Sequence, residues 1–337
     1  MSLPDSAPII ELIEAFRRSK TMFAAVSLGI FDRLHQQSAT AAKLAAELGM
    51  HAGALERLLD GCAALGLLDK REAVYHITPV AERYLCNESL YSLDGYIRYS
   101  DEVLYPMWGH LTEALKEGSP RWKQVFGVDG PIFNSFFRSE DAARGFMRAM
   151  HGFGMNVSPI AVAAFDLSGF RRMADLGGGT GHLAIAACEK YPQLRAVVFD
   201  LPPVLPMARE MTGRSAAWER LAVVEGDFFT GELPEADLFA LGRILHDWTD
   251  EKCRLLLRKI ADRLPSGGAL LIMEKLLAED GVGPVSANMQ SLNMLIVTEG
   301  KERSLGEYTG LLRDCGFAEV AGHTTGAWLD VVLARKR

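Results

Sequence analysis

The spacing of apolar residues predicts helices over about the first 165 residues of the chain. Between residues 9 and 35 apolar side chains recur at every third or fourth position, and the pattern stops near Gly29. Residues 40–65 then predict two helices with a short turn at Gly49, and residues 66–78 predict a small hairpin. Helix, turn, helix and hairpin in this order are typical of a winged-helix module.

Residues 90–165 continue the helical pattern and are rich in bulky side chains. Gly118, Pro120, Gly127, Gly130 and Pro131 predict a loop between the two halves of this stretch. Aromatic residues and methionines at helical spacing usually form a core, and they also suit the wall of a pocket for an aromatic substrate. The residues concerned are Phe133, Phe136, Phe137, Phe146, Met147, Met150, Phe153 and Met155.

The pattern changes near residue 170, where short apolar runs alternate with helical segments. Strand-like runs end at Asp175, at Asp200 and before Asp227, and a helix is predicted from residue 250 between two further runs. Strands that alternate with helices predict an α/β fold with a doubly wound, Rossmann-like parallel sheet. Residues 316–337 hold two strand-like runs joined by "HTTG", and we expect them to close the sheet with an antiparallel strand.

Composition excludes several classes of protein. The chain has 337 residues, of which 49% are hydrophobic and 23% charged, as in ordinary globular proteins. Its five cysteines form no C-x-x-C pair, which favours reduced, buried thiols over a disulfide framework or a zinc site. We see no signal peptide and no apolar run long enough to span a membrane. We therefore expect a cytoplasmic protein with no membrane contact.

A winged-helix module raises the alternative of a DNA-binding regulator. Residues 1–100 hold 10 Lys and Arg against 12 Asp and Glu, and the predicted recognition helix has Arg57 against Glu56 and Asp60. Phosphate contacts by cationic side chains supply most of the affinity for DNA. We therefore expect no nucleic-acid partner and interpret residues 1–100 as a dimerisation domain.

A glycine-rich turn, "DLGGGTG" at residues 175–181, follows the first strand of the predicted sheet and opens a helix. Glycines such as Gly177 and Gly179 let the backbone bend sharply and approach a ligand, with helix amides available beyond. The third glycine comes one residue too early for the dinucleotide pattern G-x-G-x-x-G. A tight connection without a ligand is the alternative for such a turn.

Acidic residues end the next two strands. Asp200, followed by Leu201, stands where doubly wound sheets place the acid that accepts both ribose hydroxyls, although it could also cap a helix. Gly226 and Asp227 end the following strand, with Phe228 placed to lie against a flat ring. Three successive strand ends thus predict a nucleoside site at the carboxyl edge of the sheet.

The predicted cofactor is S-adenosylmethionine. The glycine spacing differs from the dinucleotide pattern, and no cations that would clamp a phosphate lie nearby. An adenosine with an amino-acid tail therefore fits this turn better than a pyrophosphate does.

The stretch "LGRILHDW" at residues 241–248 places an imidazole, a carboxylate and an indole at the end of a buried strand. Taken alone, His246 and Asp247 could simply cap the helix that follows. The nucleoside-binding strand ends upstream favour a chemical role for His246 instead.

Five motifs in this order, "DLGGGTG", "VVFDLP", "GDFF", "LHDW" and "GKERS", resemble the S-adenosylmethionine-dependent small-molecule O-methyltransferases of the plant caffeate and isoflavone type. The resemblance is closest to the acetylserotonin (hydroxyindole) O-methyltransferases and their bacterial relatives, and it covers essentially the whole chain. It implies a dimerisation domain over residues 1–100, linking helices at the substrate pocket over 101–165, and a catalytic domain over 166–337. It also implies a homodimer and methyl transfer to an aromatic hydroxyl, with S-adenosylhomocysteine as product.

The resemblance implies that His246 is the general base and that Glu274 and Glu302 flank it. A neutral phenol with a pKa of about 10 is a poor nucleophile, and an imidazole with a pKa of about 6.5 can take its proton. A carboxylate on the other ring nitrogen would fix the tautomer. An enzyme of the same fold that methylates nitrogen, hydroxylates or decarboxylates is the alternative, but a hydroxyl acceptor is what needs a base.

The remaining site residues follow from the motifs and from the resemblance. Arg243 is expected to contact the cofactor, unless it extends from the strand end into solvent. Asp247 and Asn293 are expected to orient the acceptor, whereas Trp248 is expected to serve packing. The full cofactor set is Asp175, Gly177, Gly179, Asp200, Leu201, Gly226, Asp227, Phe228 and Arg243. The full acceptor set is Asp247, Asn293, Met294, Val297 and Met150.

Two positions depart from the hydroxyindole pattern. Gly154 stands in place of a tryptophan near the cofactor, and Val297 stands in place of a glutamine near the acceptor. The acceptor therefore stays open between hydroxyindoles, phenols, hydroxyquinones and other small hydroxylated aromatic compounds. No metal is expected, because catechol-type enzymes use magnesium where this chain has a histidine base. The other histidines, which show no ligand spacing, are expected at the surface or in packing: His35, His51, His76, His110, His151, His182 and His323.

Overall fold

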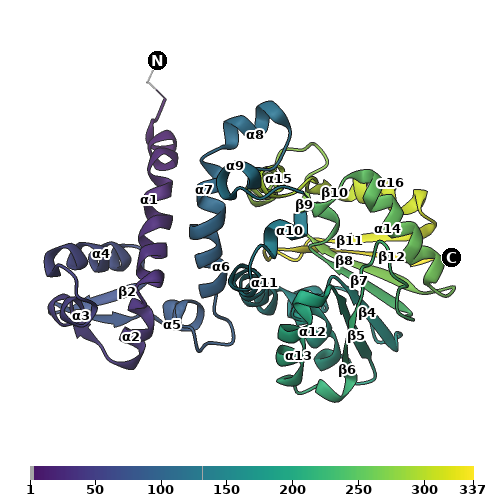
Figure 1. Cartoon of the computed structure of the whole chain (residues 1–337), viewed down its shortest axis with the longest axis horizontal. Coiled ribbons are helices and arrows are strands. Elements are labelled where there is room, and N and C mark those ends of the chain that lie inside the picture. Colours follow the sequence, from purple (N-terminus) through teal and green to yellow (C-terminus); the bar gives the residue numbers. More distant parts are fainter. Residues whose placement is uncertain (1–3, 131) are drawn as a thin grey trace. The chain divides into compact units, whose positions relative to one another are not determined.

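The computed structural model describes residues 4–130 and 132–337. The chain divides into two compact units, one that reaches to Val103 and one from Leu104 to Arg337 (Figure 1). Each unit has hydrophobic clusters of its own. Pro131, part of the predicted loop, lies outside the described residues. Over the described ranges, no helix combines the length and the apolar character that a membrane crossing requires.

The first unit is mainly helical. A helix, a turn, a second helix and a hairpin follow one another between Ala41 and Ile77, in the order that the apolar pattern predicts. The hairpin strands join a short third strand in an antiparallel sheet of order β1-β3-β2. The elements are α1 (Ala7–Ser27), α2 (Ile30–Gln36), β1 (Ala39–Thr40), α3 (Ala41–Leu48), α4 (Ala52–Ala64), β2 (Leu68–Arg71), β3 (Val74–Ile77), α5 (Pro79–Leu85) and α6 (Asp94–Tyr99).

The second unit begins with helices that precede its sheet. The longest of them, α11, is preceded by Ser139, whose hydroxyl accepts the backbone N–H of Ala142 as an N-cap. A π-helical turn over Ser100–Leu104 leads into this group. The helices are α7 (Tyr105–Trp108), α8 (Leu111–Glu117), α9 (Trp122–Phe126), α10 (Ile132–Phe136) and α11 (Glu140–Ala161).

The remainder of the second unit contains a seven-stranded sheet with helices on both faces and a separate pair of two-residue parallel strands. The order of the seven-stranded sheet is β11-β12-β8-β7-β4-β5-β6, in which β8 to β6 run parallel and β12 is antiparallel to both neighbours. The prediction of a doubly wound, Rossmann-like sheet with an antiparallel closing strand is confirmed. The elements are β4 (Arg172–Leu176), α12 (His182–Lys190), β5 (Arg195–Asp200), α13 (Leu205–Gly213), β6 (Leu221–Glu225), β7 (Leu238–Gly242), α14 (Asp250–Arg263), β8 (Ala269–Glu274), β9 (Leu276–Leu277), α15 (Val285–Val297), β10 (Arg303–Ser304), α16 (Leu305–Asp314), β11 (Phe317–His323) and β12 (Asp330–Lys336).

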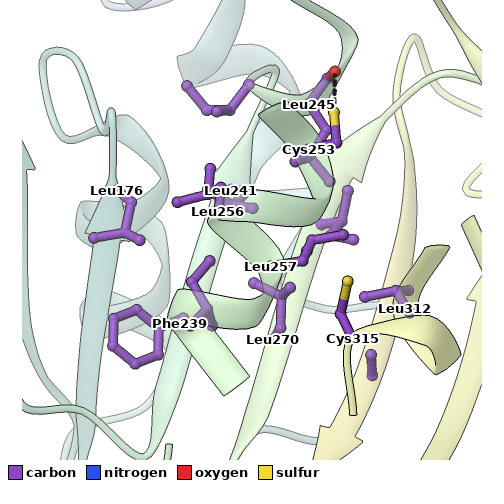
Figure 2. Close-up of a cluster of buried hydrophobic side chains, with 14 of the residues drawn as sticks. Leu176, Phe239, Leu241, Leu245, Cys253, Leu256, Leu257, Leu270, Leu312 and Cys315 are labelled. Carbon is purple, nitrogen blue, oxygen red and sulfur yellow. Dashed lines mark hydrogen bonds between the residues drawn. The ribbon is translucent and has the colours of Figure 1, made fainter. Parts of the chain in front are cut away.

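Alternate residues along the strands face two hydrophobic clusters. Phe239 and Leu241 of β7 pack in one cluster with α14 and α16, whereas Leu238 and Ala240 pack in the other with α11 and α12. Figure 2 shows the first cluster, in which Leu257 of α14 is buried among the strand side chains. This period of two, with helices covering both faces, is what a buried parallel sheet requires.

The parallel strands place several turns at one edge. The chain segments that follow β4, β5, β6 and β7 all leave the sheet at the carboxyl ends of those strands. Ligands of open α/β sheets bind at this edge, because strand-end loops converge there. The motifs singled out in the sequence are therefore brought together by the topology of the sheet.

Candidate active site

A cavity of about 480 Å³ lies at the carboxyl edge of the sheet. The strand ends contribute part of its lining, and the segment from α10 through α11 contributes a wall of aromatic and methionine side chains. The predicted residues that line it are Gly177, Gly179, Asp200, Leu201, Gly226, Asp227, Phe228, Arg243, Asp247 and Met150. The wall residues are Phe133, Phe136, Phe137, Phe146, Met147 and Phe153.

The turn after β4 has a backbone that only glycine adopts without strain. Gly177, Gly179 and Gly181 have φ values of 64°, 59° and 81°. A Cβ at residue 177 would lie 2.5 Å from the side chain of Ile244. The turn therefore presents bare backbone to the cavity.

Asp200 connects this turn to the end of β5. Its Oδ2 accepts the backbone N–H of Gly179 at 2.8 Å, and its Oδ1 accepts that of Leu201 at 2.7 Å. Burial raises the pKa of Asp200 to about 6, against the two backbone donors, which lower it. The group is therefore ionised at neutral pH, and each of its oxygens keeps a lone pair for a further donor.

Asp227 shapes the next turn. Its Oδ1 accepts the backbone N–H of Phe229 at 2.8 Å and its Oδ2 accepts the hydroxyl of Thr230 at 2.9 Å. These contacts hold the segment that carries Phe228, whose ring is buried and lines the cavity.

Asp175 lies behind the glycine-rich turn and does not line the cavity. Its side chain is buried, and its Oδ2 has no hydrogen-bond partner among the described residues. Burial raises the pKa of Asp175 to about 7. A Cβ at Gly178 would come within 2.8 Å of this carboxyl group, so Asp175 supports the turn from below.

Glu274 binds the backbone of the "RILHDW" turn. Its Oε1 accepts the N–H groups of Ile244, Leu245 and His246 at 3.1, 2.6 and 3.2 Å, and its Oε2 accepts the hydroxyl of Tyr308. Burial raises its pKa. Of the two acids expected beside the imidazole, Glu274 thus hydrogen-bonds to the main chain and not to the ring.

Arg303 holds the carbonyl groups of the same turn. Its guanidinium donates to the carbonyl oxygens of Leu245 at 2.9 Å and Trp248 at 3.0 Å, and it forms an ion pair with Asp250 at 2.8 Å. The side chain is 1% exposed. The buried carboxyl group of Glu274 therefore binds N–H groups of this short loop, and the buried guanidinium of Arg303 binds its carbonyl groups.

His246 is paired with Glu302. Its Nδ1 lies 2.6 Å from Glu302 Oε1, and its Nε2 lies 3.7 Å from Oδ1 of Asp247, which lines the cavity. Burial lowers the pKa of His246 and raises that of Glu302 to about 8. Burial also raises the pKa of Asp247 to about 6. The arrangement can hold a proton on Nδ1. His246 itself does not line the cavity, and its other ring nitrogen lies beside the carboxyl group of Asp247, which does.

His246, Glu274 and Glu302 are also close enough to be tested as a metal site. Ligand atoms of the three lie within 4.8 Å of one another. The two oxygens of Glu274 already accept three backbone N–H groups and one hydroxyl. This donor set fits proton handling better than metal coordination.

Arg243 has a strained backbone. Its φ of 59° lies in the left-handed region, which costs a non-glycine residue roughly 1–2 kcal/mol. Its guanidinium lies 3.1 Å from Sδ of Met150 and 5.0 Å from the ring centre of Phe153. Arg243 therefore lines the cavity instead of extending into solvent. Strain of this kind is often concentrated at functional sites.

The acceptor residues expected on α15 lie outside this cavity. Asn293 accepts the indole N–H of Trp108 at 3.0 Å, and the carbonyl of Val297 accepts that of Trp122 at 2.7 Å. Val297 lines a second cavity of about 560 Å³, and Met294 is buried without lining either. Asn293, Met294 and Val297 thus do not line the cavity that Asp247 lines.

Two residues that were given no role in a site border a cavity. Trp248 packs in the hydrophobic core, as expected, and also lines both cavities. His182, expected at the surface or in packing, lines the first cavity. The signal for His182 was its position directly after the glycine-rich turn, since the first residue of such a helix faces the ligand edge.

Comparisons with known proteins agree with this geometry. The family model described as "O-methyltransferase domain" matches residues 108–318, and the model described as "O-methyltransferase dimerisation domain" matches residues 10–87. The acetylserotonin O-methyltransferase of Bos taurus is 41% identical over 333 residues, which cover 97% of this chain and 96% of that protein.

Two solved structures are similar over nearly the whole chain. Human N-acetylserotonin methyltransferase in complex with SAM has a TM-score of 0.94 and 38% identity, covering 100% of this chain and 99% of that one. PigF with SAH has a TM-score of 0.88 and 31% identity, covering 99% and 100%.

We expect the substitution Asp175→Asn to flatten the pH dependence of stability in the ligand-free protein. The folded protein keeps this proton up to a pKa of about 7, whereas the unfolded chain releases it near 3.8. Its stabilising contribution is complete below the unfolded value and is lost as the pH rises to about 7, at roughly 1.4 kcal/mol per pH unit for one proton. Urea unfolding across this pH range measures the slope.

Asp166→Asn is the matched control. Asp166 is exposed, and its pKa is lowered by the backbone N–H of Ser168, so it titrates below the range tested. An unchanged slope in Asp175→Asn would contradict a buried, proton-holding Asp175.

Proposed function

The chain belongs to the O-methyltransferase family, and on that premise we propose that it methylates the hydroxyl of a hydroxyindole of the N-acetylserotonin type, with His246 as general base. Membership confirms the prediction of an S-adenosylmethionine-dependent O-methyltransferase. The acceptor and the roles of single residues are the proposed part. The observation that carries them is the buried His246–Glu302 pair next to Asp247, which lines the cavity.

The residues at the strand ends fit the cofactor. We assign the two ribose hydroxyls to the carboxylate of Asp200, which is ionised and keeps lone pairs free. Phe228 offers an apolar ring for the adenine. Leu201, Gly226 and Asp227 border the cavity where we place the nucleoside. Gly177 and Gly179 offer backbone atoms to the remainder of the cofactor.

When bound there, S-adenosylmethionine supplies a methyl group on a positively charged sulfur. His246 acts on the acceptor: its neutral Nε2 takes the proton of the hydroxyl as the oxygen becomes a nucleophile. Glu302 accepts the Nδ1–H and stabilises the imidazolium that forms. Glu274 keeps the backbone of the turn in place and therefore positions His246 without a hydrogen bond to its imidazole.

An apolar, flat acceptor fits the wall of the cavity. Phe136 and Phe146 stack with ring centres 4.3 Å apart, and Phe133 and Phe137 stack at 5.9 Å. Apolar rings of this kind favour an aromatic substrate through area burial and offset stacking. Met150 and Asp247 complete this region. Asn293, Met294 and Val297 stay predictions for the acceptor, since they do not line this cavity.

We expect methyl transfer from labelled cofactor to hydroxyindoles, and we expect His246→Gln to lower turnover about 10²-fold or more, as for a positioned base. A panel of hydroxyindoles, flavonoids and polyketide phenols measures the acceptor preference. His323→Gln, at an exposed position, is the control and should keep wild-type turnover. Undiminished turnover in His246→Gln would remove the assignment of the base, and a panel without hydroxyindole methylation would remove that of the acceptor.

The state of Glu302 should control the pH profile. Burial raises its pKa to about 8, and a protonated Glu302 would donate to Nδ1 and leave the hydrogen on Nε2, where it blocks the base. We expect kcat/KM to rise about tenfold per pH unit below that value and to level off above it. Glu302→Gln, whose amide oxygen accepts from Nδ1–H at every pH, should lose this rise. A rise that persists in Glu302→Gln would show that another group causes it.

We also propose that the chain forms a homodimer through its dimerisation domain. Helix α1 carries large apolar side chains on one face that the described residues leave uncovered: Ile9, Leu12, Ile13 and Phe16 are 62%, 74%, 61% and 52% exposed. An exposed apolar stripe of this size marks an interaction surface, and a second copy offers the same stripe under two-fold symmetry.

Ile13→Glu should therefore convert the dimer to a monomer, because it introduces a charge into the centre of that stripe. Light scattering coupled to size exclusion measures the mass. Leu115→Glu, on α8 and 60% exposed, introduces the same charge elsewhere and should leave the dimer intact. A wild-type protein that elutes as a monomer would contradict the proposal.

A cytoplasmic location stays part of the proposal. Its support is the set of free, buried cysteines, Cys62, Cys86, Cys188, Cys253 and Cys315, which need no oxidising compartment.

A further inference from the structure

Gly154 of α11 and His182 of α12 share one space at the cavity. A Cβ at residue 154 would lie 2.3 Å from the imidazole of His182. Side chains do not approach so closely, so the imidazole occupies the volume that a side chain at residue 154 would otherwise fill. Both residues line the cavity. The glycine that departs from the family pattern is thus matched by a histidine from the neighbouring helix.

Ser158 determines which nitrogen of His182 carries the hydrogen. Its hydroxyl lies 2.8 Å from Nδ1 of His182, is fully buried, and has no other hydrogen-bond partner among the described side chains and backbone groups. Burial, above all, lowers the pKa of His182 to about 3, so the ring is neutral. A buried hydroxyl has to donate its hydrogen, and the imidazole nitrogen is the acceptor within reach. Nδ1 therefore accepts, and Nε2 carries the hydrogen.

The Nε2–H of His182 is available to a ligand. In the described part of the chain, this ring nitrogen makes no hydrogen bond to protein, and the ring lines the cavity. His182 is also the first residue of α12, a helix of nine residues whose amino end carries partial positive charge.

A second donor lies near this one. The positive charge of Arg243 contributes, after burial and His151, to the low pKa of His182, and its side chain lines the same cavity. A neutral N–H, a guanidinium and a helix amino end converge on one region. Together they suit a carboxylate, which accepts several charge-assisted hydrogen bonds at once.

We propose that the Nε2–H of His182 donates to the α-carboxylate of S-adenosylmethionine, and that the Gly154–His182 pair positions the amino-acid end of the cofactor. The carboxylate is the only negatively charged group of that molecule. The inference rests on the proposed function in one respect, the placement of the ribose at Asp200, which leaves the amino-acid end for the region of His182 and Arg243.

Two ligands that differ in the amino-acid end test the proposal. S-adenosylhomocysteine carries the carboxylate, whereas 5′-methylthioadenosine has the same nucleoside without it. His182→Phe keeps a ring in the space beside Gly154 and removes the N–H. We expect it to weaken S-adenosylhomocysteine about 10- to 100-fold by calorimetry, the usual range for a hydrogen bond to a charged group. Affinity for 5′-methylthioadenosine should change less than about twofold, and His182→Gln, which restores an N–H, should recover part of the loss.

Gly154→Ala is the second variant and leaves the imidazole chemistry intact. Its Cβ displaces the ring, so the same selective loss of S-adenosylhomocysteine is expected. An equal loss of both ligands, or no loss of either in His182→Phe, would overturn the proposal. Thermal melting of each variant identifies a general loss of structure.

Asp200→Asn separates this inference from the proposed function. It should weaken both ligands, because both carry the ribose. If it weakens neither while His182→Phe acts selectively, the ribose placement fails and the role of His182 stands.

Discussion

The geometry of the candidate active site depends on one buried carboxylate, that of Glu274. It accepts three successive backbone N–H groups, from Ile244 to His246, and one hydroxyl from Tyr308. A carboxylate without such donors would be too costly to bury. Arg303 satisfies the carbonyl side of the same loop. This clamp holds the left-handed backbone of Arg243 and aims His246, so the cavity and the base are parts of one hydrogen-bonded unit.

The chemistry of the site follows from burial. Glu302, Asp247, Asp200 and Asp175 lie at or behind the carboxyl edge, and burial raises the pKa of each. Carboxyl groups that resist ionisation in the ligand-free protein become easier to ionise beside a positive charge. A cofactor with a sulfonium group supplies such a charge, and the apolar wall opposite favours a flat acceptor. The same edge thus suits both ligands of a methyl transfer.

Much of the site could be predicted from the chain because strand ends are local features. Asp200, Asp227 and the glycine-rich turn lie at strand ends that parallel topology always gathers at one edge. The resemblance implies Glu274 as an acid beside the base, but its bonds to the backbone depend on how β8 lies next to β7, which no local pattern specifies.

The order of apolar and polar residues was enough for the doubly wound sheet with its antiparallel closure, and short motifs were enough for the cofactor. These predictions depend on periodicity and on short motifs, which can be recognised without knowledge of tertiary contacts. Packing between distant segments decided the rest. Only the folded chain shows that Glu302 and not Glu274 bonds to the imidazole, and that Gly154 leaves room for His182. Such pairings depend on side chains that meet across helices and strands far apart in sequence. The distances between them are set by the packed structure and not by any local pattern.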